Sequence, residues 1–531
     1  MNRRKFIQLG SVAAASLLAE EEVMAKTIVV KKSGAFTIVE ASVAELQAAM
    51  TSGKLTAQKC AELYLARIKA IDKSGARLNA VIELNPDALS VAAALDAERK
   101  EKGPRGPLHG IPILLKDNIA TADKMSTSAG SIALANVKPP RDAFIVANLR
   151  AAGAVILGKT NLSEWANIRS TRSTSGWSSR GGLTKNPYAL DRNTSGSSAG
   201  SGAAVAASLA AVAVGTETDG SITSPASING LVGIKPTVGL VSRDGIVPIS
   251  HSQDTAGPMA RTVADAAALL TALCGVDARD SATAGSKDKT RDYTRFLDAN
   301  GLAGARIGVT RNFFGGNDRI QAVMEGELAL LKSKGAILVD VELPNAEKYA
   351  ESELEVLLFE LKADLNKYLA EFAGAGSVKT LADVIAFNEK NKLTVMPYFS
   401  QELFIRAEAK GGLDSKVYLD ALANNLRYSR DEGIDKVMLA NKLDALIAPT
   451  GSPAWMTDLV NGDNSGASFT SPAAVAGYPH ITVPAGFVSG LPIGLSFVGG
   501  AYSEATLIKL AFAYEQASKH RRAPRYLATI R

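Results

Sequence analysis

The sequence predicts an α/β protein, because short apolar runs typical of buried strands alternate with segments that have helical spacing. The first strand-like runs cover residues 81–84, 113–115 and 154–157. The chain has 531 residues, of which 46% are hydrophobic and 21% charged, so it can bury a large core and has an ordinary globular composition. No repeat of fixed period and no long low-complexity linker interrupts it, which favours one domain.

Helical patterns precede and separate these strands. Ser42 and Glu45 have the spacing of a capping box at the start of a helix. Further helices are expected over residues 57–72 and 86–100. Residues 201–213 are dominated by Ala and Val with almost no polar face, so we expect a helix that is buried on most sides.

Residues 280–440 differ from the rest of the chain. They are richer in Lys, Glu and Asp and contain long helical patterns, so we expect a helical insertion into the core domain. The chain then returns to strand-like runs and ends in a helix near residues 503–519. The strands expected in this last part cover residues 445–448, 480–483 and 494–498.

The N-terminus resembles a bacterial export signal. Arg3 and Arg4 precede a mildly apolar stretch over residues 9–19, which is typical of a twin-arginine signal, and the small residue Ala25 offers a cleavage site. We expect residues 1–25 to be this signal and the protein to be periplasmic or secreted. If the segment is an unexported amphipathic N-terminus, the protein is cytoplasmic. No later stretch reaches about 18 uninterrupted apolar residues, so no membrane span is expected.

Charge and cysteine content exclude other classes. The formal net charge is +6, but the basic residues are scattered without an aromatic stripe, which argues against a nucleic-acid partner. Cys60 and Cys274 are the only cysteines, and two cannot build a zinc site by themselves. We expect free thiols, although one disulfide in an oxidising compartment stays open.

Two short motifs compete for the active site and are rejected. Residues 153–160 match the phosphate-binding pattern G-x-x-x-x-G-K-[ST], but Val, Ile and Leu fill the would-be loop and form a strand, whose amides serve the sheet. Residues 196–200 match G-x-S-x-G, the nucleophile elbow, but no buried strand precedes them. None of the later histidines has a convincing setting for that chemistry; they are His251, His480 and His520.

A lysine and two serines form a third arrangement. Lys116 follows an apolar strand and precedes Asp117-Asn118, which places its amine in a desolvated site. Ser197 and Ser221 lie 24 residues apart in two turns rich in glycine and serine. At the second turn, successive backbone amides could stabilise an oxyanion, and a substrate carbonyl could approach closely. The amides are those of Thr218, Asp219, Gly220 and Ser221.

These segments resemble the amidase signature family over roughly residues 40–525. The resemblance rests on residues 108–237 and on later motifs, including Asp254-Thr255-Ala256-Gly257-Pro258-Met259 and residues 490–495. It implies a single domain over residues 40–525, with a large mixed β-sheet core flanked by helices on both faces. It also implies amide hydrolysis without a cofactor or metal.

The resemblance also implies a role for each residue of the trio. Ser221 would be the nucleophile that carries the acyl group, Ser197 a proton relay with a cis peptide bond, and Lys116 the base. Ser198 would be a supporting hydroxyl. A lysine must be neutral to act as a base, so burial has to lower its pKa well below its usual value near 10.4.

The second turn departs from the common family pattern, because Asp219 stands where a glycine is usual. Its carboxylate must therefore point away from the oxyanion or bind part of the substrate. This variant is similar to the bacterial peptide amidases, which remove the C-terminal amide of peptides. The substrate expected is therefore a peptide amide or another small amide.

Two other functions stay open from the sequence. One is a broad amidase for aliphatic or aryl amides. The other is an A-type subunit of a tRNA-dependent amidotransferase, which the export-like N-terminus argues against. A monomer or a homodimer would fit, and no stable membrane insertion is expected.

Overall fold

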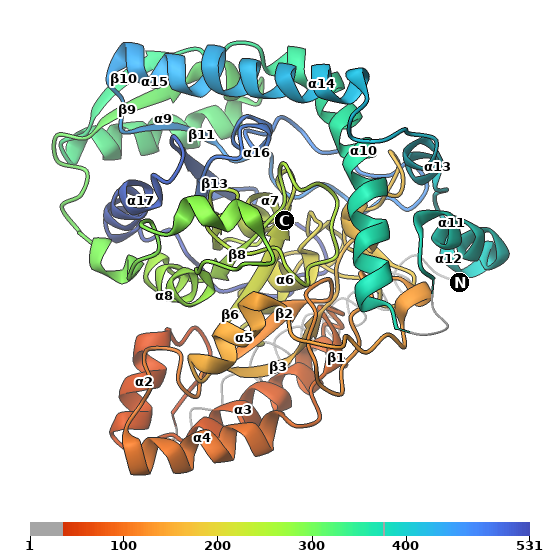
Figure 1. The fold of residues 1–531 in the computed structure, drawn as a ribbon. Coiled ribbons are helices and arrows are strands. Elements are labelled where there is room, and N and C mark those ends of the chain that lie inside the picture. The colour runs from red at the N-terminus through yellow and green to blue at the C-terminus, as the bar shows by residue number, and fades with distance from the viewer. Residues whose placement is uncertain (1–35, 375–377, 531) are drawn as a thin grey trace, which may run out of the picture. The chain divides into compact units, whose positions relative to one another are not determined.

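A computed structural model describes residues 36–374 and 378–530 of the chain (Figure 1). The chain divides into two units, Met1–Thr37 and Ile38–Arg531, and the second of these is the unit described below. The export signal predicted over residues 1–25 lies outside the described residues. Among the helices of the described ranges, none is both long and apolar enough to cross a membrane.

An 11-stranded mixed sheet forms the core, in the order β1-β3-β2-β6-β8-β7-β12-β13-β11-β9-β10. Neighbouring strands are parallel at β3-β2-β6 and at β11-β9-β10, and antiparallel elsewhere. The strands are β1 (Val81–Leu84), β2 (Pro112–Lys116), β3 (Val155–Thr160), β6 (Val212–Glu217), β7 (Val232–Lys235), β8 (Thr255–Ala260), β9 (Arg306–Thr310), β10 (Ile337–Val341), β11 (Ala445–Pro449), β12 (His480–Val488) and β13 (Leu491–Val498). A small separate sheet pairs β4 (Trp177–Ser178) with β5 (Gly182–Leu183).

Helices flank the sheet on both faces, so the α/β class with a large mixed sheet is confirmed. The helices of the first half are α2 (Val43–Thr51), α3 (Ala57–Arg67), α4 (Ala88–Lys102), α5 (Phe144–Ala151), α6 (Ala199–Ala206), α7 (Thr223–Ile228) and α8 (Val263–Leu273). The second half contributes α9 (Asp318–Ser333), α10 (Ala346–Phe372), α11 (Leu381–Lys390), α12 (Lys392–Val395), α13 (Glu402–Glu408), α14 (Lys416–Leu426), α15 (Asp435–Asn441), α16 (Ser471–Val475) and α17 (Glu504–Ser518). Figure 1 shows the long helix α10 beside the sheet, with α14 packed against it.

Short helical turns complete the chain. Two are π-helical, η1 (Ile68–Asp72) and η7 (Arg427–Ile434). The others are the 3₁₀ turns η2 (Ile132–Leu134), η3 (Glu164–Asn167), η4 (Ser281–Ser286), η5 (Tyr293–Phe296) and η6 (Arg311–Phe313).

Local signals in the sequence account for several elements. Ser42 and Glu45 form the predicted capping box at the start of α2, because the serine hydroxyl accepts from the Glu45 amide and the Glu45 carboxylate accepts from the Ser42 amide. The strand predicted inside the phosphate-loop motif is β3. Its Lys159 is buried and donates to the carbonyl of Ile119 and the hydroxyl of Thr127, so it supports the fold.

Two predicted elements need correction. The apolar run over residues 201–213 is not one helix: α6 ends at Ala206, and residues from Val212 belong to the central strand β6. Both parts are fully buried, and a run buried on all sides carries no periodicity that separates helix from strand. The expected helical insertion over residues 280–440 also contains β9 and β10, which extend the main sheet at its edge.

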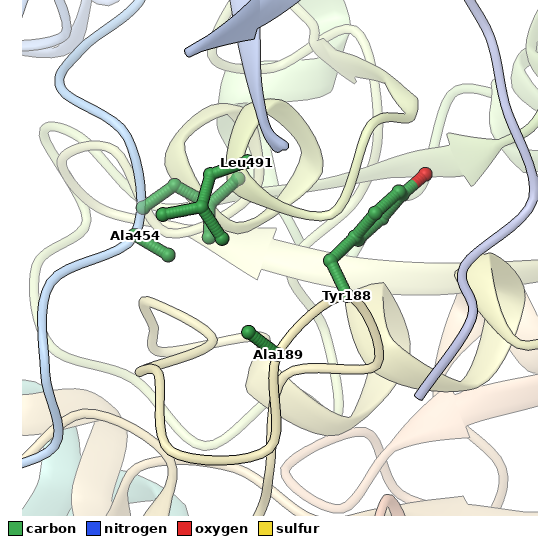
Figure 2. Close-up of a cluster of buried hydrophobic side chains, with 5 residues drawn as sticks. Tyr188, Ala189, Ala454 and Leu491 are labelled. Carbon is green, nitrogen blue, oxygen red and sulfur yellow. The ribbon is translucent and has the colours of Figure 1, made fainter. Parts of the chain in front are cut away.

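A buried apolar cluster holds the loop that leads to Ser197. Tyr188 and Ala189 from this loop pack with Ala454 and with Leu491 of β13, as Figure 2 shows. Ile228 of α7 completes the cluster. The polar loop of residues 189–195 is thereby anchored to the sheet, although it is not itself a strand. Elsewhere in the core, Cys60 and Cys274 are buried and free.

Candidate active site

The site lies where neighbouring parallel strands end. Lys116 is the last residue of β2, and Glu217 is the last residue of β6. These strands are paired in parallel, with Ile113 opposite Val212. Their carboxyl ends therefore meet at the same edge of the sheet, the usual position of ligand sites in open α/β sheets.

Lys116 is fully buried and surrounded by oxygen atoms. Its Nζ lies 2.7 Å from Ser197 Oγ, 2.8 Å from Thr216 Oγ1 and 3.1 Å from the carbonyl oxygen of Thr216. A neutral amine has two N–H donors and one lone pair, so it can donate twice to Thr216 and accept the proton of Ser197. The geometry therefore suits a lysine that acts as a base.

Burial lowers the pKa of Lys116 to about 7, although the nearby negative charges of Asp254 and Glu217 act in the opposite direction. Desolvation dominates because the ammonium form loses its water without gaining a direct ion pair. At neutral pH a large fraction of the lysine is therefore unprotonated. The desolvated setting expected from the apolar strand before Lys116 is confirmed.

Ser197 and Ser198 are held from both sides. The Gly196–Ser197 peptide bond is cis, as the family resemblance implied. The carbonyl of Ser197 accepts from the Ser163 amide at 3.1 Å, and the Ser198 amide donates to the carbonyl of Ser221 at 3.1 Å. Ser198 Oγ also donates to the Thr216 carbonyl at 3.0 Å and accepts from the Thr216 amide at 3.2 Å. Ser198 thus joins the two serine turns to the end of β6.

Ser221 follows a tight turn and is 8% exposed. The turn needs Gly220, whose φ is +73° and whose added Cβ would lie 3.0 Å from Thr470 Oγ1. The Glu217 carboxylate accepts from the amides of Ile222 and Thr223 at 2.8 and 2.9 Å, which fixes the chain just beyond the serine. The backbone of Ser221 is thereby clamped on both sides.

The turn also presents free donors. Among the described residues, none accepts a hydrogen bond from the amides of Asp219, Gly220 or Ser221. Successive unpaired amides beside a nucleophile are the donors that an oxyanion hole requires. The side chain of Asp219 is directed elsewhere, because its Oδ2 accepts from Ser471 Oγ at 2.6 Å.

Three polar residues of the site were missed in the sequence. Thr216 holds Lys116, and Asn118 donates to Thr216 Oγ1 at 2.9 Å. Asp254 accepts from Thr218 Oγ1 at 2.6 Å and from the amides of residues 249 and 250. Burial raises the pKa of Asp254 to about 6. Asn118 and Asp254 stand in segments already singled out, and that proximity was the available signal.

A cavity of about 150 Å³ opens beside these residues. Asn118, Thr216, Thr218 and Asp254 line its inner end, and Tyr368 of α10 lies on its outer wall. The cavity therefore approaches the partners of Lys116 and the start of the oxyanion turn.

The histidines have partners away from the two serines. His251 Nδ1 lies 2.8 Å from Asp364, His480 Nε2 lies 2.6 Å from Ser496 Oγ and His520 Nε2 lies 2.9 Å from Glu327. The arrangement therefore gives no support to a nucleophile-elbow enzyme, in which a histidine serves the serine. In the part of the chain that the structure describes, one group could offer three ligands to a metal ion, and it consists of His251, Glu360 and Asp364. Its Glu360 already accepts hydrogen bonds from Ser250, Ser252 and Tyr418.

A buried lysine, two serine turns and an unpaired amide turn define a serine amide hydrolase that does not use histidine. The family model described as Amidase matches residues 60–508, and the chain belongs to this amidase family. The recognition of the family and of an amide-hydrolysing enzyme is therefore confirmed.

Known proteins align over almost the whole chain. A probable amidase of Arabidopsis thaliana is 43% identical over 510 residues, which cover 94% of each chain. The structure of a peptide amidase from Stenotrophomonas maltophilia is 52% identical, with a TM-score of 0.87, and the match covers 92% of this chain and 99% of that one. The A-type subunit of a glutamyl-tRNA(Gln) amidotransferase from Symbiobacterium thermophilum is 36% identical, and the match covers 91% of this chain and 98% of that one.

Proposed function

We propose that this protein removes the C-terminal amide of peptides through an acyl-enzyme on Ser221. The observation that carries the chemistry is the 2.7 Å contact between the buried amine of Lys116 and Ser197 Oγ. The similarity to a peptide amidase supports the choice of substrate. The Asp219 variant of the oxyanion turn supports it too, because this variant is similar to that of the bacterial peptide amidases.

The proposed acylation step moves one proton along the trio. Ser221 Oγ attacks the amide carbon while its proton passes to Ser197 Oγ, and the proton of Ser197 passes to the neutral amine of Lys116. The carbonyl oxygen becomes an oxyanion, for which the amides of the turn at residues 218–221 are the donors. The proton then returns through Ser197 to the nitrogen of the leaving group, the C–N bond breaks and ammonia leaves.

Deacylation uses the same groups in the same order. A water molecule takes the place of the attacking serine and gives its proton to Lys116 through Ser197. Its oxygen bonds to the acyl carbon, the ester bond to Ser221 breaks, and the proton returns to Ser221 Oγ. The products are a peptide acid and a regenerated enzyme.

Ammonia release from a C-terminally amidated peptide tests this function. Free glutamine and a simple aryl amide serve as comparison substrates, and the Ser221→Ala protein serves as the blank. We expect fast release from the peptide amide, with kcat/KM falling by more than about a thousandfold in Ser221→Ala because the nucleophile is lost. Turnover of the simple amides alone would assign a broad amidase instead. Full activity in the Ser221→Ala protein would contradict the proposed nucleophile.

A further inference from the structure

An acidic recess lies beside the oxyanion turn and has no part in the proton relay. Asp219 from the turn and Glu353 from α10 are both partly exposed there. Gln253 connects α10 to the turn, because its Nε2 donates to Glu353 Oε1 at 2.9 Å and to the carbonyl of Thr218 at 3.3 Å. Tyr349 stands one helical turn before Glu353 and therefore on the same face of α10.

Several polar atoms of this recess have no partner. The atoms are Asp219 Oδ1, Gln253 Oε1 and the hydroxyl of Tyr349. Gln253 is 1% exposed and Tyr349 is 2% exposed, so these are buried polar side chains. Leaving such groups unpaired costs about 1–3 kcal/mol each. The recess is therefore organised as if a ligand completed it.

The recess also lacks a compensating positive charge. Lys235 lies near enough to act on Asp219, but its ammonium donates to the carbonyls of Ala473 and Tyr478. Burial raises the pKa of Asp219, and burial together with the charge of Asp219 raises the pKa of Glu353 to about 8. Two neighbouring carboxyl groups in this state gain most from a cation that binds between them.

The free acceptors match one kind of ligand. A protonated primary amine has three N–H donors and no acceptor. Asp219 Oδ1, Gln253 Oε1 and the carboxylate of Glu353 offer three acceptors, and Tyr349 can donate to a carboxylate. Charge-assisted hydrogen bonds of this kind are about twice as strong as neutral ones.

The position of Asp219 indicates which part of a substrate would bind. It precedes Ser221 by two residues, which span at most about 7 Å of chain. The α-amine of an amino-acid amide is attached to the carbon next to the scissile carbonyl, and that of a dipeptide amide lies one residue further. A free α-ammonium can therefore reach the recess while the carbonyl lies at Ser221.

We propose that Asp219, Glu353 and Gln253 form a subsite for the protonated α-amine of a short substrate. The enzyme would then prefer amino-acid amides or dipeptide amides with a free N-terminus. This inference rests on the proposed amide hydrolysis and names the substrate class within it.

Calorimetry on the Ser221→Ala protein tests the subsite without turnover. The ligands are phenylalanine amide and glycyl-phenylalanine amide, each with a free and with an acetylated α-amine. We expect at least one free amine to bind about tenfold more tightly than its acetylated form, because acetylation removes the charge and two donors. Equal or tighter binding of both acetylated ligands would overturn the proposal, as would an absence of binding by all four.

Glu353→Gln and Glu351→Gln form a matched pair for the same experiment. Both substitutions remove one negative charge from α10, but Glu351 is exposed. We expect the preference for the free amine to disappear in Glu353→Gln and to persist in Glu351→Gln. A preference retained in a folded Glu353→Gln protein, as judged by thermal unfolding, would overturn the subsite. If Glu353→Gln does not fold, Gln253→Leu provides the same comparison.

Two further arms separate other outcomes. Ammonium chloride that displaces the acetylated and free ligands equally would assign the recess to the released ammonium ion, against the proposal. In the wild-type enzyme, Ser221-dependent turnover of acetylated peptide amides without amine preference would overturn the subsite and leave the proposed function intact. Amine-dependent binding with no turnover of any amide would support the subsite and contradict the proposed function.

Discussion

Lys116 determines how activity depends on pH at the level of single residues. Its amine must be neutral to accept a proton, and burial lowers its pKa to about 7. Below that pH the lysine is protonated and inactive as a base, so kcat/KM should rise as pH increases through about 7 and then level off. Rates with a peptide amide between pH 5 and 9 measure this limb. A flat profile across that range would contradict the role of Lys116.

Asp254 provides a control for the same assignment. Its negative charge raises the pKa of Lys116 against the larger effect of burial. Asp254→Asn removes that charge, so the acidic limb should move to lower pH whatever happens to the maximal rate. A shift of the limb to higher pH would mean that another group titrates there.

Thr218 connects the oxyanion turn to Asp254 through one hydroxyl. Thr218→Val keeps the backbone amide and the shape but removes the 2.6 Å hydrogen bond to Asp254 Oδ1. The loss of a hydrogen bond to a charged group costs about 1.5–3 kcal/mol, so kcat/KM should fall by about tenfold or more. Thr218→Ser retains the hydroxyl and should recover most of the rate. If valine and serine behave alike in steady-state kinetics, the hydroxyl does not position the turn.

Helix α6 shows, among the elements, why the serine turn is rigid. Gly200 lies near its start, and a Cβ at this position would come within 2.3 Å of the carbonyl oxygen of Ala80 and 2.4 Å of that of Asn161. The helix therefore rests directly on the backbone of two other segments, which are Ala80 before β1 and Asn161 after β3. This close packing positions the turn at Ser197 and Ser198.

Two glycine substitutions in helices should therefore have opposite effects. Gly200→Ala should destabilise the protein by about 1–3 kcal/mol, because backbone atoms must move to admit the methyl group. Gly326→Ala in α9 meets no atom within 4 Å at an exposed position and should stabilise by about 0.5–1 kcal/mol. Denaturant unfolding of both variants measures the difference. Equal stability of the two proteins would show that the contact at Gly200 relaxes freely.

Elements also differ in how well their sequences predict them. β2, β3 and β11 follow from the sequence because each is a short apolar run bounded by polar or turn residues. The start of β6 is hidden in an apolar run that predicts a helix over residues 201–213, and β9 and β10 lie between helical segments that dominate the local composition. Pairing with neighbours distant in sequence stabilises these strands, and that contribution leaves no local pattern.

Export concerns the molecule as a whole. We propose from the sequence alone that residues 1–25 direct the folded protein out of the cytoplasm, through the adjacent Arg3 and Arg4. Replacement of both arginines by lysine keeps the charge and should abolish export. Cell fractionation with an activity assay on each fraction measures the effect. Equal distribution of the wild-type and variant proteins would show that the arginines are not read as a signal.

Short segments of the sequence were enough to establish the family, the α/β class and the candidate trio of Lys116, Ser197 and Ser221. These depend on residue types alone, and a lysine after an apolar strand or a glycine in a tight turn is visible there. The folded chain was needed to find that Thr216 holds the lysine, that Asp254 holds Thr218 and that α10 brings Glu353 toward Asp219. Those contacts join segments up to about a hundred residues apart or more, and only the pairing of strands and the burial of helices against them set such distances.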